Sequence, residues 1–424
     1  MNSSNLPGSY LSRRVFGTGV AAAVLTPAFL RSSAAAASDF PNSGLVSVVQ
    51  TSTSTHQPGL QVSHYDVVAT HGASKAHLFT VDLRISTTNL LCTKTIAWNQ
   101  RLDDMAEDAG AIAAVNADFF QNSVEHAGVP ATFAPVGVEI LDGKILKSAV
   151  PEGQRYGGTM PNPENRGNEV IGVQRNGRGA VTRIELDAFI NNERIGKIAV
   201  NGLNIYGMDV NQITAFDHRW GRLSRQRVAC GTNRSRRDVC STDVVEVILT
   251  NNKVTSISPT IGAGQLGEKQ LAIVGREQGA AKLRQLQVGD EVASNFRGVA
   301  ENGNKFDWAV AGGIFVKDGA LTANISNQPG EPRTYAGVDA AGETMYLLTI
   351  DGRDNVSKGI STRDGADLVR HLGAHDGVLL DGGGSSTMIA RDGLEGDWEL
   401  LNRSRVSGIE VLRYIPNGIG IFPY

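Results

Sequence analysis

Turn-forming dipeptides between apolar segments recur along this chain and favour antiparallel strand pairing. Asp142-Gly143 lies within "VGVEILDGKILK" and Asp318-Gly319 within "GGIFVKDGALT". Asn251-Asn252 and Ala341-Gly342 take the same place in two further segments. Tight hairpins need residues that tolerate positive φ, such as Asn, Asp and Gly. The chain is therefore expected to be rich in β-hairpins.

Two segments have a helical pattern and interrupt the hairpins. One runs from Asn99 to Gly110, and the other follows Thr362, a candidate N-cap, and ends near Gly373. Each precedes an apolar strand, "AIAAVNADFF" or "GVLLD". The expected fold is α+β, a mostly antiparallel mixed sheet with helices packed on it. Residues 152–180, rich in Gly, Asn, Pro and Arg, are expected to form a surface excursion.

The N-terminus has the features of an export signal. Arg13 and Arg14 precede an apolar run and then "SSAAAAS". This order is typical of a twin-arginine signal peptide, here residues 1–37, and predicts a secreted or periplasmic protein. A disordered basic tail or a short membrane anchor is the alternative. We expect residues 38–424 to form one catalytic domain without a transmembrane segment.

Charge and cysteines narrow the class of protein. A net charge of −3 over 424 residues argues against a nucleic-acid binder. Cys230 and Cys240 bracket "GTNRSRRDV", and a disulfide between them suits an oxidising compartment, although two free thiols are the alternative. Cys92 is expected to pack as a small apolar residue, and no cysteine spacing indicates zinc. The oligomeric state stays open.

The segment "GVLLDGGGSSTMIA" is the strongest candidate for chemistry. Asp381 ends an apolar strand, and three glycines and three hydroxyl residues follow it. The segment lacks the lysine of a P-loop and the spacing of GxSxG. Glycine N–H groups can form a nest for an anion beside the carboxylate, which would suit sugar or phosphorylated substrates. The alternative is a tight turn whose hydroxyls cap the backbone.

Three other segments place polar residues at strand ends. Asn116 and Asp118 end a buried strand in "VNADFF", Asp351 and Arg353 lie in "TIDGRD" at the end of another, and Arg333 in "EPRTYAG" lies just before a strand. Several such strand ends can build one site at a sheet edge. Taken singly, each is more simply a turn-forming aspartate or a surface arginine.

Five motifs occur together in a fixed order: "AAVNADFF", "GVEILDGKIL", "WAVAGGIFVKDG", "RTYAGVDAAGETMYLLTIDGR" and "LLDGGGSSTMIA". With the closing "LRYIPNGIGIF", they resemble the phosphodiester glycosidase family, from about Ala76 to the C-terminus. The resemblance implies hydrolysis of a sugar-1-phosphodiester at the anomeric carbon, with a glycan or sugar phosphate as the partner.

The resemblance and the strand ends together give the expected site residues. Catalytic roles are expected for Asp381, Asp118 and Asp351; substrate or phosphate contacts are expected for Asn116, Arg333, Arg353, Gly383, Gly384, Ser385, Ser386, Thr387 and Arg413. A divalent cation at Asp351 or Asp118 is a further option, and no cofactor is required.

Two other functions remain open at this point. One is a glycoside hydrolase on a polysaccharide without phosphate; the other is a non-catalytic glycan-binding protein of the cell envelope. Residues 217–240 add an arginine-rich loop, which is either solvated or a contact surface for an anionic glycan. Its arginines are Arg219, Arg222, Arg225, Arg227, Arg234, Arg236 and Arg237.

Overall fold

The computed structural model describes residues 35–36, 40, 43–155, 167–322, 325, 330–403, 405–406, 409–410 and 412–424. The described residues from Ala35 onward belong to one compact unit. Apart from Ala35 and Ala36, the expected signal peptide lies outside the described residues.

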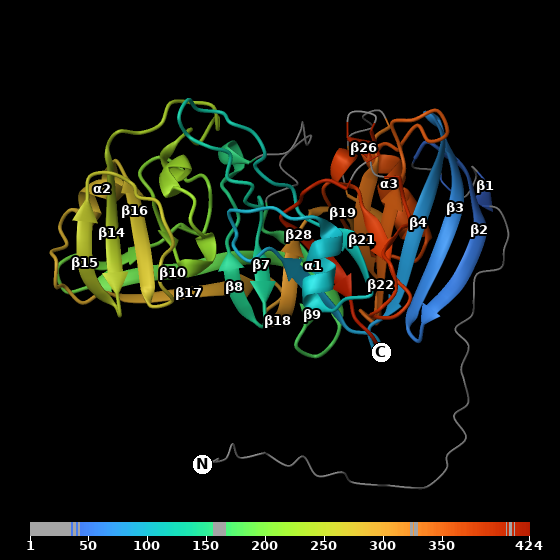
Figure 1. Cartoon of the computed structure of the whole chain (residues 1–424), viewed down its shortest axis with the longest axis horizontal. Helices are drawn as coiled ribbons and strands as arrows, with labels where there is room; N and C mark the ends of the chain where they lie inside the picture. Colours follow the sequence, from blue (N-terminus) through green and yellow to red (C-terminus); the bar gives the residue numbers. More distant parts are fainter. Residues whose placement is uncertain are drawn as a thin grey trace, which may run out of the picture. The chain divides into compact units, whose positions relative to one another are not determined.

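The compact unit is built from β-sheets (Figure 1). In spatial order, the nine-stranded sheet contains β1 (Ala35–Ala36), β2 (Leu45–Gln57), β3 (Leu60–Ala69), β4 (Gly72–Asp82), β22 (Thr344–Ile350), β21 (Arg333–Val338), β23 (Asp376–Leu379), β19 (Gly313–Lys317) and β20 (Ala320–Leu321). The seven-stranded sheet contains β11 (Gly196–Ala199), β10 (Gly179–Asn192), β9 (Glu169–Gln174), β18 (Phe306–Ala311), β7 (Glu139–Leu141) and β8 (Lys144–Lys147), with β17 (Ala293–Ala300) on β10.

Two five-stranded sheets and a small two-stranded one complete the strands. One contains β12 (Gly202–Leu203), β13 (Ile213–Phe216), β16 (Gln270–Arg276), β14 (Val244–Thr250) and β15 (Lys253–Ser258). The other contains β25 (Glu399–Leu400), β24 (Met388–Ala390), β6 (Ala113–Asn116), β28 (Asn417–Ile421) and β5 (Thr88–Cys92). The smallest pairs β26 (Arg405–Val406) with β27 (Ile409–Glu410).

The expected antiparallel pairing is confirmed, but helices are fewer than an α+β fold suggests. Among the described residues the α-helices are α1 (Leu102–Ala109), α2 (Gln278–Leu283) and α3 (Thr362–His371). Only β12 and β13 pair in parallel among the strand pairs described. The structure is thus closer to all-β, because most apolar segments pair as hairpins instead of packing as helices.

The predicted turns form, and two local expectations change. Asp142 and Asn251 adopt φ of 51° and 50° in their hairpins. The cap of α3 is Ser361, whose hydroxyl accepts the Asp364 N–H, and not Thr362. The surface excursion expected at 152–180 is wrong in part, because "EVIGVQ" forms the largely buried strand β9 between β10 and β18.

Strand register brings the candidate segments to one edge. Arg333 pairs with Ile350, the residue before Asp351, and Tyr335 pairs with Leu379, two residues before Asp381. The beginning of β21 therefore meets the ends of β22 and β23. The segment after β23 then crosses to β24, so residues 381–387 link the nine-stranded sheet to the sheet that contains β6 and β28.

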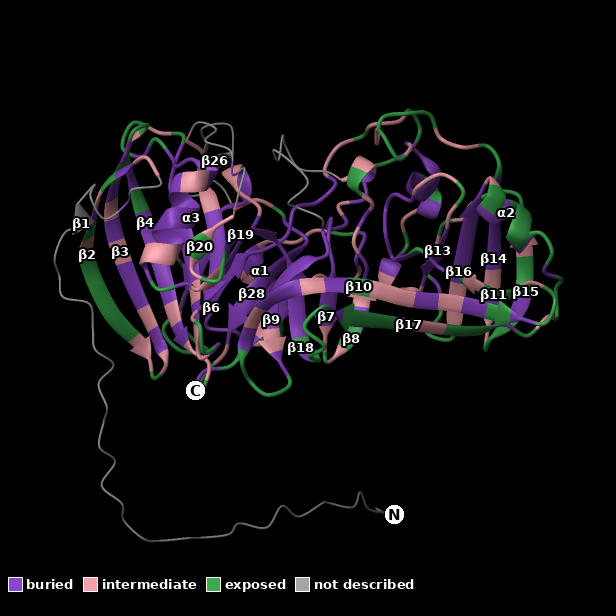
Figure 2. Ribbon diagram, turned by 180° about the vertical axis from the view of Figure 1, so that it is seen from behind, coloured by how far each residue is buried: buried purple, intermediate pink, exposed green. Residues whose placement is uncertain are grey.

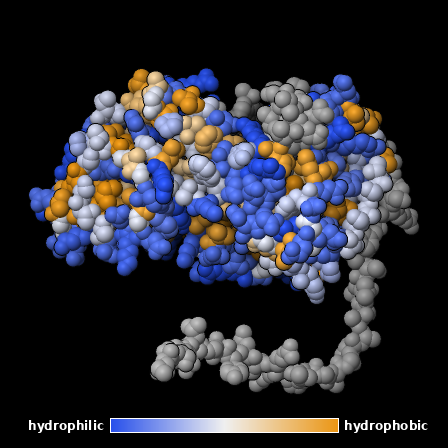
Figure 3. Space-filling model, viewed as in Figure 1, coloured by the Kyte–Doolittle hydropathy of each residue, from blue (hydrophilic) through white to orange (hydrophobic). Residues whose placement is uncertain are grey.

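The strands differ in how far they are buried. Figure 2 shows exposed residues along β17. Strand β21, in contrast, is buried beyond its first residue. Helix α3 packs on β21 and β23 (Figure 1). Within the described residues no helix is long and apolar enough to span a membrane. On the face in Figure 3, apolar side chains are scattered among hydrophilic ones.

Candidate active site

Asp381 and the glycines after it form a tight, internally bonded loop. The N–H groups of Asp381 and Gly383 donate to Ala117 O at 2.7 Å and Pro332 O at 2.8 Å, and the Thr387 N–H donates to Asn116 Oδ1 at 3.0 Å. These donors therefore face the protein. In the short 3₁₀ turn Gly383–Ser385, the N–H groups of Ser385 and Ser386 donate to Gly382 O and Gly383 O. The backbone donors of Gly383, Ser385 and Ser386, expected to form an anion nest, therefore already have partners within the protein.

Asp381 is a half-buried residue, and the pKa of its carboxyl is raised to about 6. Removal from water is the main cause. Four groups oppose this increase in pKa because they favour the anion: the Ser385 hydroxyl, the Arg413 guanidinium, the Gly382 N–H and Arg333. A carboxyl with this pKa changes protonation near physiological pH, which suits proton transfer or charge stabilisation at a reacting centre.

Three arginines from separate segments surround the loop. Arg413 Nη1 donates to Ser385 Oγ at 3.3 Å, and the side chain of Arg333 lies beside Gly382. Arg353 lies beside Gly383, where its Nη2 would be 2.9 Å from an added Cβ. Arg353 is also paired with Glu331, its Nε donating to Glu331 Oε2 at 2.5 Å. The three expected arginines therefore lie beside the loop, where guanidinium groups could meet an anion.

Asn116 holds the loop in place. Its Nδ2 donates to Asp381 O at 2.7 Å, and its Oδ1 accepts the Thr334 hydroxyl at 2.8 Å as well as the Thr387 N–H. Ser385, Ser386 and Thr387 are buried, as is Gly384. These residues lie together, as expected, and they are buried within the loop.

The Asp118 carboxylate takes part in a different buried cluster. Its Oδ2 accepts the Gly137 N–H at 2.7 Å, and burial raises its pKa. Nearby, burial lowers the pKa of Lys147, whose ammonium donates to Val136 O, Gly137 O and Ser148 O. Glu139 completes the cluster and has a raised pKa, also caused by burial.

Sequence reasoning missed both Lys147 and Glu139. Lys147 occupies a strand that reads as an ordinary exposed hairpin arm, "KILK", and Glu139 lies on its partner strand. No sequence motif marks either residue. Only the pairing of the two strands shows that their charged groups lie together in the interior.

Asp351 is buried, and its carboxylate contacts groups of two other residues. Its Oδ1 accepts the Arg403 N–H at 2.8 Å, and its Oδ2 lies 3.4 Å from His77 Nε2. His77 Nδ1 in turn lies 2.8 Å from His64 Nδ1, so the two rings share one proton between these atoms. Burial, then His77, lowers the pKa of His64.

Among the described residues, neither Asp118 nor Asp351 belongs to a group of three side chains whose ligand atoms lie close together. Among the described residues, two groups of three have ligand atoms close together: His126, Cys230 and Cys240, and Asp318, His375 and Asp376. Neither contains Asp118 or Asp351. The two cysteines of the first group form a disulfide.

Two cavities of similar size have no lining residue in common. One of about 700 Å³ is lined by Phe120, Phe133 and Arg413, next to the Asp381 loop. The other, of about 690 Å³, is lined by Arg183 and Asp376 and by no expected site residue. Asp376 begins the strand that ends near Asp381, so this second cavity is remote from the loop.

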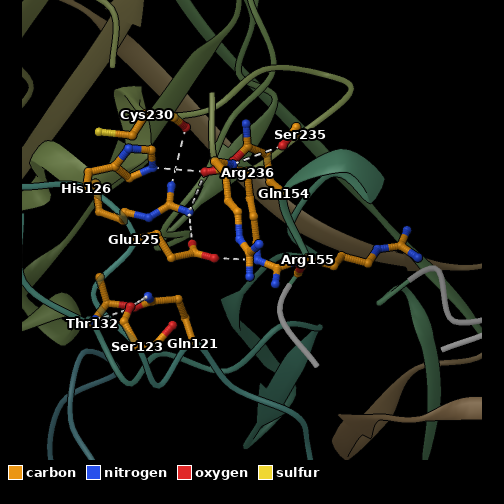
Figure 4. A network of polar contacts seen from close by, with 12 residues as sticks. Gln121, Ser123, Glu125, His126, Thr132, Gln154, Arg155, Cys230, Ser235 and Arg236 are labelled. Carbon is orange, nitrogen blue, oxygen red and sulfur yellow. Dashed lines mark hydrogen bonds and ion pairs between the residues drawn. The ribbon is translucent and has the colours of Figure 1, made fainter. Parts of the chain in front are cut away.

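The arginine-rich loop is largely a structural ion network. Arg225 pairs with Glu246 at 2.8 Å, and Arg227 pairs with Glu125 at 2.7 Å, each pair being 5% exposed or less. Arg236 also pairs with Glu125 (Figure 4). Three members, Arg222, Arg234 and Arg237, are exposed. Hence only part of this loop is available as a contact surface.

We expect Gly383→Val to raise KM about tenfold or more. Gly383 has a φ of +61°, which valine rarely adopts, and an added Cβ would displace the Arg353 guanidinium. Gly393→Val is the control, since Gly393 has a φ of +68° but open space at its Cβ position. Equal KM values in both variants would show that Arg353 does not contact substrate.

Cys230 and Cys240 are joined by a disulfide, while Cys92 is free. The bridge closes a short loop, with a sequence separation of 10, and should stabilise by less than about 3 kcal/mol. Denatured, unreduced protein should take up one alkyl group by mass spectrometry, and reduced protein three. Three labels before reduction would exclude the bridge.

The last three of the five motifs lie within a region that matches a known family model. Residues 244–422 match the family model described as phosphodiester glycosidase, which confirms the resemblance for this part of the chain and supports a glycosidase-type function. The matched range contains Asp351 and Asp381, and also the arginines beside the Asp381 loop, Arg333, Arg353 and Arg413. Asn116 and Asp118 precede it. No curated protein matches the chain.

Solved structures share the fold at low identity. A hypothetical protein from Synechocystis is 21% identical, with a TM-score of 0.65 over 86% of this chain. The matched region spans only 62% of that protein's length. A protein described as exported, from Burkholderia pseudomallei, is 20% identical, with a TM-score of 0.63, covering 83% of this chain and 74% of its own.

A third structure is the catalytic domain of zebrafish N-acetylglucosamine-1-phosphodiester alpha-N-acetylglucosaminidase, auto-inhibited by its pro-peptide. It is 12% identical, with a TM-score of 0.42, covering 89% of this chain and 88% of its own.

Proposed function

We propose that this protein hydrolyses a sugar-1-phosphodiester in a cell-envelope or extracellular glycan. The observation that carries the proposal is the half-buried residue Asp381, whose carboxyl has a pKa of about 6, among Arg333, Arg353 and Arg413. A carboxylate stabilises positive charge at an anomeric carbon, and guanidinium groups stabilise a departing phosphate.

In the proposed reaction, water adds to the anomeric carbon. The bond from that carbon to the phosphate oxygen breaks, and the phosphate monoester leaves with the electron pair. Asp381, as the anion, faces the sugar and accepts the proton of the attacking water. Phosphate is a good leaving group, so protonation by a second carboxyl is not required. Asp118, bonded to Gly137 and buried near Lys147, has no part in this proposal.

An assay panel tests the proposal. Purified protein is incubated with an N-acetylglucosamine-1-phosphodiester, with phosphate-containing wall polymers and with neutral α-glycosides. We expect release of sugar from the phosphodiesters alone. Cleavage of neutral glycosides alone would identify an ordinary glycoside hydrolase, and binding without cleavage of any substrate would identify a glycan-binding protein.

Export through the twin-arginine route is a second part of the proposal. Replacing both Arg13 and Arg14 with lysine should trap the precursor in the cytoplasm, because the receptor reads this pair. Cell fractionation and immunoblotting measure the precursor and mature forms. Normal secretion of the double variant would refute the assignment.

A further inference from the structure

The disulfide of Cys230 and Cys240 lies against a histidine from a distant part of the chain. Ligand atoms of His126, Cys230 and Cys240 all lie within 4.8 Å of one another. Figure 4 shows His126 next to Cys230. Cys230 is buried, and His126 and Cys240 are half-buried. Two sulfurs and one imidazole are the donor types that bind zinc in proteins.

One hydrogen bond orients the His126 ring as a metal ligand would be oriented. Its Nε2 lies 2.9 Å from Arg236 O. Because a carbonyl oxygen only accepts, Nε2 carries the hydrogen, and the neutral ring keeps its lone pair on Nδ1. Histidines that bind metals are held in this way, with the second ring nitrogen donating to a carbonyl or a carboxylate. The tautomer of His126 is thus fixed before any metal binds.

Backbone hydrogen bonds join the two cysteine segments independently of the disulfide. The Ser241 N–H donates to Ala229 O at 2.8 Å, and the Gly231 N–H donates to Asp238 O at 3.0 Å. The buried Arg276 also holds this loop, since its Nη1 donates to Gly231 O at 2.9 Å. None of these bonds involves sulfur, so we expect both cysteines to stay near His126 after the disulfide is reduced.

Reduction would leave a group of ligands whose charge matches that of a divalent cation. Two electrons from a thiol or a phosphine break the sulfur–sulfur bond, and each sulfur takes up a proton, while the reductant becomes a disulfide or a phosphine oxide. Both thiols release these protons when they bind Zn²⁺. Two thiolates, a neutral imidazole and Zn²⁺ have no net charge. The neighbouring Arg227 and Arg236, both paired with Glu125, therefore do not repel the bound ion.

We propose that Cys230 and Cys240 in their reduced form, together with His126, bind a zinc ion. Three protein ligands leave the fourth tetrahedral position to water. The ion takes the place of the disulfide as the cross-link of this loop when the folded chain is in a reducing compartment. The site shares no residue with the Asp381 loop, so it does not depend on the proposed function.

The test uses a Cys92→Ala background, which leaves Cys230 and Cys240 as the two cysteines of the chain. The protein is reduced with a phosphine, separated from it without air, and titrated with Co²⁺ and then with Zn²⁺. We expect one Co²⁺ per chain, with absorption from thiolate-to-cobalt charge transfer, and its displacement by Zn²⁺. The oxidised protein should show no such absorption.

A histidine variant tests the third ligand. His126→Ala should weaken Zn²⁺ binding by about tenfold or more, because loss of a group that only orients a ligand already costs that much. His56→Ala is the matched control, since His56 is also half-buried and its Nε2 lies 2.8 Å from Arg391 O. The control should bind Zn²⁺ as tightly as the background protein.

Three results would overturn the inference: equal affinity of His126→Ala and His56→Ala, the same absorption from oxidised protein, or no binding at micromolar metal. Circular dichroism shows whether the reduced, metal-free protein is folded. If it is unfolded, Zn²⁺ should restore the spectrum of the folded protein, and failure to do so refutes the site. No measurement here uses phosphodiester cleavage, so failure of the proposed function leaves this test intact.

Discussion

Replacing Asp381 with asparagine should lower turnover of the best substrate by about 10²-fold or more, because the amide can neither carry the negative charge nor accept a proton. The shape of the side chain is kept, so Asn116 and Ser385 should still hold the loop. Asp66→Asn, at a surface carboxylate that is 48% exposed, is the control. Full activity of Asp381→Asn on every substrate would mean that the loop is only a structural turn.

The same carboxyl should impose a pH dependence on activity. Wild-type kcat/KM should fall as the pH drops below about 6, since Asp381 then becomes protonated. A pH–rate profile measures this decrease, and a flat profile through pH 6 would contradict a role for the anion.

Stability should change in the opposite direction. The folded-state pKa of Asp381, about 6, lies above its ordinary value of 3.8. Its stabilising contribution is therefore present below the ordinary value and is lost as the pH rises through about 6, by at most about 3 kcal/mol. Asp381→Asn should thus match or exceed the wild-type melting temperature at pH 7.5, and this advantage should disappear at pH 4.

Replacing Glu125 with glutamine should destabilise the protein by about 3 kcal/mol or more. Arg227, whose side chain is 2% exposed, would keep its charge but lose its carboxylate partner, and breaking a buried pair on one side is costly. Arg236 would lose the same partner (Figure 4). Denaturant unfolding gives the change in free energy.

The surface pair of Arg284 and Asp243 supplies the matched control. Both side chains are well exposed, at 44% and 52%, so Asp243→Asn should change the unfolding free energy by less than about 1 kcal/mol. If Glu125→Gln were as mild as this control, the buried network would not stabilise the arginine-rich loop. If it retained stability but lost glycan binding, the loop would instead be a contact surface.

Local sequence was sufficient where a residue's own backbone preference decides the structure. Asp142-Gly143 and Asn251-Asn252 take up positive φ at low cost, so the hairpins could be predicted without knowing what they pack against. Gly110 likewise ends α1 in the left-handed conformation. Apolar strand ends that carry Asp381 and Asn116 also identified most of the residues that meet at the candidate site.

What the sequence by itself determined was therefore which residues are polar at strand ends and where the turns fall. Only the tertiary structure decided where each side chain points. It directed the Asp118 carboxylate to Gly137 and close to Lys147, bonded the Gly383 N–H to Pro332, and brought Arg413 to Ser385. The physical reason is that turn preference is set by a residue and its neighbours, whereas hydrogen-bond partners and desolvation depend on segments that meet only when the sheets assemble.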